Sequence, residues 1–177
     1  MTLEEVERAA RGREEVRLDP AARKAVARSR VVAEKVIASG ATVYGLNTGF
    51  GDLKSVRIPR SKLEELQVNL VRSHAAGVGD PFRSDVVRAM MVLRAQSFAK
   101  GHSGVTEELV DRILAMTNRA IQPVVPSQGS VGSSGDLAPL AHIALAIIGE
   151  GEVESKGKRQ DAGRALSAAK LDRKSVV

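Results

Sequence analysis

Apolar residues recur at intervals of three and four along most of this chain, and polar residues fill the positions between them. This spacing places the apolar side chains on one face of an α-helix. The pattern predicts a mainly helical protein that is interrupted by stretches rich in glycine and proline. The predicted helices cover residues 1–17, 20–40, 61–74, 84–101, 106–122 and 136–149.

Residues that favour helix ends mark several of these boundaries. Ser61 and Glu64 have the spacing of a capping box, and Ser84 and Thr106 are expected as N-caps. Pro123 is expected to terminate the fifth helix. The predicted inward faces consist of Ala22, Val26, Ser29, Ala33 and Ile37; of Leu63, Leu66, Leu70 and Val71; of Val87, Met90, Met91, Leu93 and Phe98; and of Leu109, Ile113 and Leu114.

The helical period is lost in three places. Residues 45–59, "GLNTGFGDLKSVRIP", form a long glycine-rich loop, and such loops are more often functional than merely connecting. Residues 123–130, "PVVPSQGS", are expected to be extended, because proline disfavours helix in the residue before it. Residues 151–177 are polar and basic, with a short helix expected around residues 165–169. We therefore assign residues 1–150 to one helical domain and residues 151–177 to its polar exit segment.

Composition narrows the possible chemistry. The chain of 177 residues is 43% hydrophobic but only 2% aromatic, so its core must be built from aliphatic side chains. It has no cysteine, which excludes disulfides and thiolate metal sites. His74, His102 and His142 lie far apart and lack the spacing of a metal-binding motif. We expect no metal site.

The net charge of +6 raises the question of nucleic-acid binding. Basic residues are interspersed with acidic ones, as in "RAARGREEVR", and few aromatic side chains are present to stack on bases. A solvated helical surface explains this charge better. No apolar run reaches the length of a membrane span, and no leader pattern opens the sequence. We expect a cytoplasmic protein that binds neither nucleic acid nor membrane.

The segment "GSVGSSGDLAPLAH", residues 129–142, places flexible residues directly before an apolar helix. It lacks the lysine of a phosphate-binding loop and the spacing of a dinucleotide fingerprint. A plain capping loop with Asp136 as N-cap is one interpretation. A second is chemical, since in a tightly bent Xaa-Ser-Gly tripeptide the glycine nitrogen can attack the carbonyl carbon two residues earlier. Loss of two water molecules would then leave a five-membered ring with an electrophilic methylene group, at a helix N-terminus that favours negative charge.

Four segments, in order, resemble the aromatic amino acid ammonia-lyases. They are "YGLNTGFG" (44–51), "NLVRSHAAGVGDP" (69–81), "MVLRAQSFAKGHSGV" (91–105) and "GSVGSSGDLAPLAH", and the resemblance extends to about residue 155. It implies that Ser133, Ser134 and Gly135 form the 4-methylidene-imidazol-5-one group (MIO) autocatalytically. Ser134 would supply the methylene carbon, and Asp136 would assist maturation. Ser133 stands where the family usually has alanine.

The resemblance also implies the other site residues. Tyr44 would be the general base that removes a β-proton from the substrate. Its loop, with Gly45, Asn47, Gly49 and Gly51, would close over the substrate. The form "SHAAGVG" is the one seen in histidine ammonia-lyases, so His74 would contact the imidazole of L-histidine. The products would be urocanate and ammonia, in the first step of histidine degradation. A structural role is expected for His102 and His142.

The fold implied by the resemblance is the N-terminal domain of the ammonia-lyase (fumarase/aspartase-like) fold, mainly α with little strand. Full-length members are much longer homotetramers, and their central helical bundle and carboxylate-binding arginine lie outside this sequence. Activity of the 177-residue chain by itself is therefore not expected. The alternative is an inactive, truncated relative that acts as a binding or assembly module.

Overall fold

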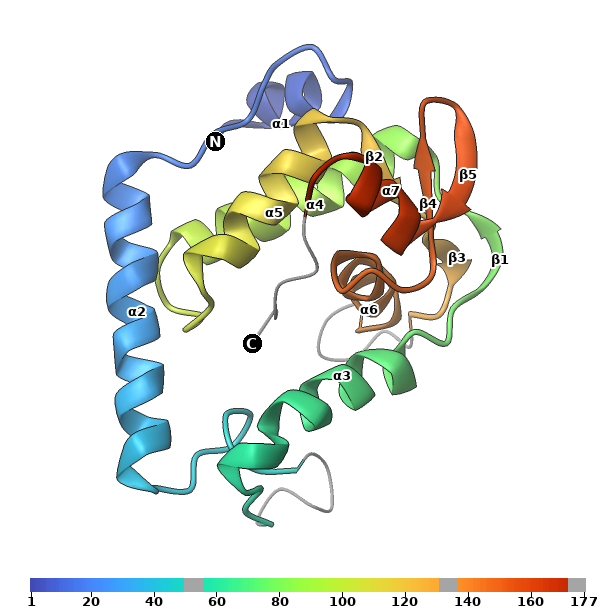
Figure 1. Cartoon of the computed structure of the whole chain (residues 1–177). Coiled ribbons are helices and arrows are strands. Elements are labelled where there is room, and N and C mark those ends of the chain that lie inside the picture. Colours follow the sequence, from blue (N-terminus) through green and yellow to red (C-terminus); the bar gives the residue numbers. More distant parts are fainter. Residues whose placement is uncertain (50–55, 131–136, 172–177) are drawn as a thin grey trace.

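The computed structural model describes residues 1–49, 56–130 and 137–171, and these residues are mainly helical (Figure 1). The helices are α1 (Leu3–Ala10), α2 (Pro20–Ser39), the 3₁₀ turn η2 (Arg60–Lys62), α3 (Leu63–His74), α4 (Ser84–Ala99), α5 (Glu107–Asn118), α6 (Leu137–Ile147) and α7 (Ala162–Ala168). The strands are β1 (Val78–Pro81), β2 (Ile121–Pro123), β3 (Pro126–Gln128), β4 (Glu152–Ser155) and β5 (Lys158–Asp161).

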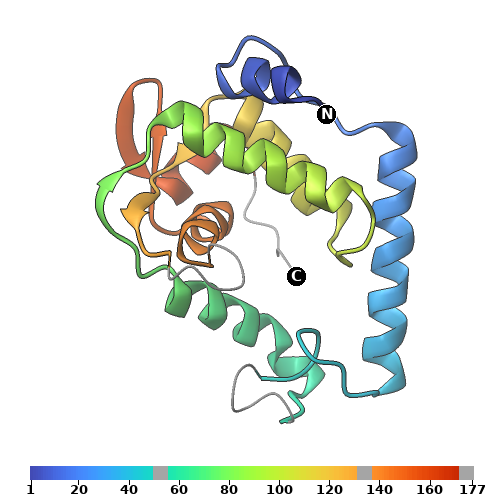
Figure 2. The ribbon, with the colours of Figure 1, turned by 180° about the vertical axis from the view of Figure 1, so that it is seen from behind.

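Helices α4 and α5 lie side by side, and α1 packs against α4. Figure 2 shows the same pair from behind, with α2 along one edge and α3 on the far side of α6. Helix α3 packs against α6, and α6 contacts α7 and β2. The strands form two small antiparallel sheets, one of β1 and β3 and one in the order β2-β4-β5. The prediction of a mainly helical domain with little strand is confirmed.

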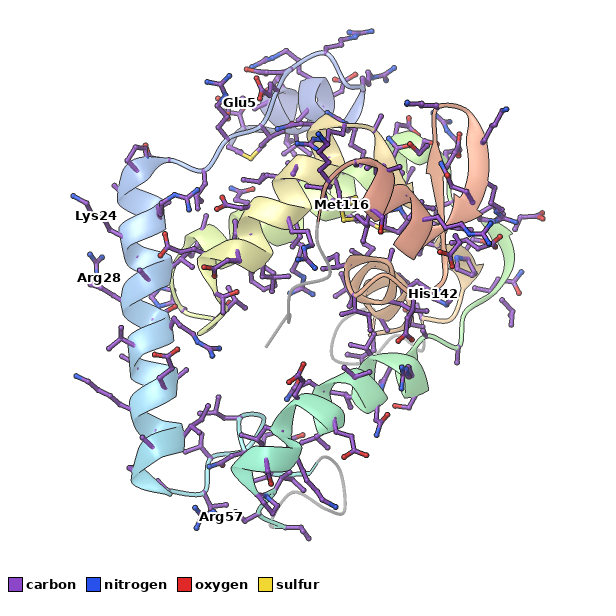
Figure 3. All side chains as sticks on the ribbon, in the orientation of Figure 1. Glu5, Lys24, Arg28, Arg57, Met116 and His142 are labelled. Carbon is purple, nitrogen blue, oxygen red and sulfur yellow. The ribbon has the colours of Figure 1, made fainter. Side chains whose placement is uncertain are left out.

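One aliphatic cluster joins α2, α4, α5, α6 and α7 with strands β2 and β4, and Met116 of α5 is among its members (Figure 3). Aliphatic side chains are sufficient to fill this core, because small and branched residues allow the helices to pack closely. The fully buried members include Val26, Val87, Met91, Val110, Met116, Val125, Val153 and Leu166. Among the described helices, none is long and apolar enough to cross a bilayer.

Helix ends were predicted with mixed success. Thr106 is confirmed as an N-cap, because its hydroxyl accepts a hydrogen bond from the Leu109 N–H at 3.2 Å. The predicted capping box at Ser61 is wrong, since Ser61 lies inside η2 and α3 starts at Leu63 without a side-chain cap. Ser84 is the first residue of α4 and not its cap, and its hydroxyl donates to Glu154 at 3.1 Å.

Two other predicted helix limits are wrong. Helix α5 ends at Asn118, five residues before Pro123, and Pro123 instead closes strand β2. The first helix is shorter than the predicted 1–17, because Gly12 adopts a left-handed φ of 68° just after α1. Left-handed backbone cannot continue a right-handed helix, so the chain turns there.

The buried face of α4 differs from the prediction at Leu93 and Arg88. Leu93 is 49% exposed, while Arg88 is only 5% exposed. The Arg88 guanidinium donates to the backbone carbonyls of Ala9 and Thr117, so it links α1 to α4 and α5. Burial lowers the pKa of Arg88, since desolvation disfavours the charged form. No apolar pattern can reveal such a buried cation.

The polar segment after residue 150 contributes to the core as far as it is described. Strands β4 and β5 form a hairpin that was not predicted, and α7 follows close to where a short helix was expected. Val153, Ala165 and Leu166 are buried against α6 and β2. The buried position of Val153 was difficult to predict, because a strand with one buried face carries polar residues at every second position.

Candidate functional site

A cavity of about 620 Å³ opens between α3, α4, α5 and α6. Its walls are mostly aliphatic, which suits a site that excludes water from a substrate. Its few polar groups come from Tyr44, His74 and Arg94. The full lining consists of Tyr44, Leu70, Val71, His74, Arg94, Phe98, Leu109, Ile113, Leu137, Leu140, Ala141, Ile143, Ala144 and Ile147.

Tyr44 reaches this cavity from the loop that follows α2. The loop turns at Gly45, whose φ of 78° lies in the left-handed region that glycine tolerates best. The Tyr44 side chain is 64% exposed, so the phenol lies at the mouth of the cavity and not in the core.

The rest of the loop is anchored where it passes Asn47 and Gly49. Asn47 and Thr48 are buried, although both are polar. The Ile58 N–H donates to the Asn47 carbonyl at 2.9 Å, and the Gly49 N–H donates to the Val56 carbonyl at 3.1 Å. These bonds join the two ends of the glycine-rich loop. Gly51 lies outside the described residues.

His74 is the last residue of α3, and its imidazole lines the same cavity as Tyr44. Its Nδ1 lies 2.9 Å from the Leu70 carbonyl oxygen and 3.0 Å from the Ser73 hydroxyl. A carbonyl only accepts, so Nδ1 carries the hydrogen in the bond to Leu70. In the neutral ring, Nε2 is then an acceptor that can bind an N–H donor.

His142 lies on the side of α6 that faces the segment after α3 (Figure 3). Its Nε2 accepts a hydrogen bond from the Gly77 N–H at 3.1 Å. Burial lowers the pKa of His142, which favours the neutral ring that this bond requires. Gly77 itself has no room for a side chain, because a Cβ would approach His142, Pro126 and Gln128 to 3.1–3.3 Å. The role expected for His142, a satisfied structural histidine, agrees with these contacts.

Sequence reasoning missed Arg94. Its guanidinium lines the cavity and lies 5.5 Å from the centre of the Phe98 ring, a cation–π distance. Burial lowers the pKa of Arg94. The available signal was a charged residue inside the apolar run "MMVLRAQSF", where an exposed position was the simpler interpretation.

The residues expected to form the electrophile, Ser133, Ser134 and Gly135, lie outside the described residues, as does Asp136. Their neighbours on both sides are described. Gly129 packs its Cα region against Gly77 and Ala138, where an added Cβ would meet atoms at 2.9 and 3.1 Å. Leu137 begins α6 and lines the cavity. The chain therefore enters and leaves this segment close to the cavity that holds Tyr44 and His74.

His102 does not line the cavity. It lies between α4 and α5 in an exposed position, and its expected structural role stays a prediction. The part of the chain that the structure describes contains no group of three or more acidic or histidine side chains placed to hold a metal ion.

Comparison with known proteins gives a consistent result. The profile of the aromatic amino acid lyase family matches residues 1–175. A histidine ammonia-lyase of Geobacillus thermodenitrificans (strain NG80-2) is 53% identical over 169 residues, which are 96% of this chain and 34% of that protein. A histidine ammonia-lyase of Deinococcus radiodurans is 50% identical over 94% of this chain and 32% of its own length.

Solved structures agree with the sequence relatives. Histidine ammonia-lyase from Trypanosoma cruzi has a TM-score of 0.89 and 36% identity, and the match covers 100% of this chain and 34% of that one. The present chain spans about one third of the length of the curated relatives that it matches.

Proposed function

The chain belongs to the aromatic amino acid lyase family, and from this premise we propose that it forms part of a histidine ammonia-lyase. The proposed reaction removes ammonia from L-histidine and leaves urocanate. A bond between Cα and the amino nitrogen breaks, a proton leaves Cβ, and a double bond forms between Cα and Cβ. One observation carries the proposal: Tyr44 and His74, thirty positions apart in the sequence, line one cavity with the helix that follows the signature segment.

The residues of the signature segment fit the cofactor of this family. Ser134 has the hydroxyl that must leave, and Gly135 has an amide nitrogen without a neighbouring Cβ, so it can approach the Ser133 carbonyl closely. Ser133 in place of alanine leaves these ring-forming atoms unchanged. Once formed, MIO would supply an electrophilic methylene carbon that makes the substrate's amine a better leaving group.

The other groups of the cavity have separate tasks in this proposal. The Tyr44 side chain, as the phenolate, accepts the β-proton of the substrate. This proton is only weakly acidic and needs a positioned base. Nε2 of His74 accepts a hydrogen bond from the substrate's imidazole N–H. The aliphatic walls from α3 and α6 exclude water and strengthen these polar contacts. The longer protein is expected to be a cytoplasmic homotetramer.

The alternative of an inactive binding or assembly module gains no support from the relatives, because proteins that align with nearly the whole chain are lyases by name. A difference in catalytic residues would be needed to favour it. Tyr44 and His74 are both present at the cavity.

The test is the substitution Tyr44→Phe in the intact protein that contains this chain. Loss of the phenolic oxygen removes the base and should lower kcat for urocanate formation by about 100-fold or more, with a smaller change in KM. Urocanate is followed by its ultraviolet absorbance. Phe98→Leu, at another lining position, serves as the control for a change in the cavity wall that leaves the phenol in place. An unchanged kcat in Tyr44→Phe would show that Tyr44 is not the base.

A further inference from the structure

The segment that carries Tyr44 holds a buried amide side chain for which the proposed reaction has no direct use. Asn47 is 3% exposed, whereas Tyr44, three residues earlier, is 64% exposed. A buried asparagine costs free energy unless both ends of its amide find partners. The partners of Asn47 therefore show what the side chain does.

Both ends of the Asn47 amide bind backbone groups that precede Tyr44. Oδ1 accepts a hydrogen bond from the Val43 N–H at 2.8 Å. Nδ2 donates to the Ala41 carbonyl at 2.7 Å. The side chain thus replaces the backbone partners that a strand or helix would give residues 41–43.

The residue directly before Tyr44 is held from two sides. The Val43 carbonyl accepts hydrogen bonds from the Leu46 N–H at 3.1 Å and the Asn47 N–H at 3.2 Å. Its N–H is bound by the Asn47 side chain. Tyr44 and Gly45 form the tip of this closed turn, and the left-handed φ of Gly45 directs the chain back toward Asn47.

The same residue ties the turn to the returning part of the loop. The Asn47 carbonyl accepts from the Ile58 N–H at 2.9 Å, and Thr48 pairs with Arg57 as an isolated β-bridge. Asn47 therefore connects three pieces of backbone, which are residues 41–43, the turn itself and residues 56–58. Without its side chain, the turn would keep these backbone bonds and lose both bonds that hold residues 41–43.

From these contacts we infer that Asn47 is a positioning residue for Tyr44. It holds the turn so that the phenol keeps one place at the mouth of the cavity. The inference rests on the proposed role of Tyr44 as the base. A proton transfer depends steeply on the position of the base, so a displacement of about 1 Å can cost about 100-fold in rate.

The first experiment follows the mobility of Tyr44 in the 177-residue chain. Tyr44 is the only tyrosine, so a protein labelled with ¹⁵N-tyrosine gives one backbone amide resonance. We expect an order parameter near the rigid value of about 0.85 in the native chain and below about 0.6 in Asn47→Ala. Asn69→Ala, at an exposed position on α3, is the matched control and should leave the value unchanged.

A second variant keeps the test decisive if Asn47→Ala does not fold. In Asn47→Asp, a protonated carboxyl can still accept from the Val43 N–H and donate to the Ala41 carbonyl. The ionised carboxylate has no donor and would face that carbonyl with its charge. The Tyr44 amide of Asn47→Asp should therefore be rigid at low pH and mobile above the pKa of the new carboxyl, which burial raises above about 4.

Activity in the intact protein separates positioning from stability. Asn47→Ala should lower kcat by about 10- to 100-fold with KM nearly unchanged, because substrate contacts remain while the base is displaced. A Tyr44 amide equally rigid in the native chain, Asn47→Ala and Asn47→Asp would overturn the inference. If Tyr44→Phe kept full activity while Asn47→Ala mobilised the tyrosine, the proposed role of Tyr44 would fail and the positioning by Asn47 would stand.

Discussion

At the scale of single residues, the bond between His142 and Gly77 joins the two halves of the candidate site. Gly77 lies three residues after His74, and its Cα packs against Gly129, which leads into the signature segment. The bond needs an unprotonated Nε2, so it is lost when His142 is protonated at low pH.

The resulting prediction is a loss of stability in mild acid. The unfolded chain binds a proton to His142 near its ordinary pKa of about 6.5, whereas burial lowers the pKa in the folded chain. The stabilisation is therefore complete above about pH 6.5 and declines as the pH falls through the lower, folded pKa. Replacement by His142→Gln, which retains an uncharged acceptor, should remove about 1 kcal/mol of this pH dependence.

Chemical denaturation at pH 7.5 and at pH 5 measures the effect as a difference in unfolding free energy. His102→Gln is the control, because it removes an exposed histidine and leaves the Gly77 bond intact. Equal pH dependence in the native chain and in His142→Gln would show that another group is responsible.

Some residues of the candidate site could be predicted from the sequence, and others could not. Tyr44 and His74 stand in motifs that the resemblance identified, and the structure brings both to one cavity. Their roles stay predictions. Arg94 and the bonds of Asn47 were not foreseen. The place of Arg94 depends on how α4 packs beside the cavity, and the bonds of Asn47 depend on which backbone atoms fold back against it.

At the scale of elements, the long helix α2 packs against the rest of the molecule partly through small residues. It runs along one edge of the molecule, and two of its small side chains, Ala25 and Ala33, face glycines that follow α4. An added Cβ at Gly101 would lie 2.7–2.8 Å from side-chain and backbone atoms of Ala25. Close approach at this point depends on the missing side chain.

We predict that Gly101→Ala separates α2 from α4. Its φ of 73° makes alanine unfavourable by about 1 kcal/mol, and the collision with Ala25 should add about 1–3 kcal/mol more. Gly12→Ala is a matched control, because Gly12 has a similar φ of 68° but nothing within 4 Å of the added Cβ. Thermal unfolding of both variants gives the difference, and equal losses in stability would mean that the contact with Ala25 is unimportant.

Helices were easier to predict than strands for a physical reason. Each predicted helix is at least 14 residues long, and an apolar spacing of three and four is recognised over that length even when the ends are misjudged. The strands have three or four residues each, too few for alternation to be distinguished from chance. Three of them contain proline, which is unfavourable within a ladder, yet Pro81 and Pro126 lie at the ends of the β1–β3 ladder and Pro123 ends β2, where a missing N–H matters least.

At the scale of the whole molecule, the cavity is a site with one side open. Tyr44 and Leu137 line it and are both exposed to solvent, although aliphatic surface in a functional site is normally covered. The relatives are about three times as long as this chain.

The last prediction separates the formation of the electrophile from catalysis in the 177-residue chain. The ring-forming atoms belong to Ser133, Ser134 and Gly135, and the two flanks of that segment meet where Gly129 packs against Ala138. Intact-mass measurement should therefore give a value two water molecules below that of the sequence, and Ser134→Ala, which has no hydroxyl to lose, should not show this deficit.

The same purified chain should produce no measurable urocanate from L-histidine, because Tyr44, at the mouth of the cavity, is 64% exposed to water. Robust urocanate production would show that one third of the family's length suffices for catalysis. A mass without the deficit would instead show that the ring does not close in this chain, and the lack of activity would then have a chemical cause as well as a structural one.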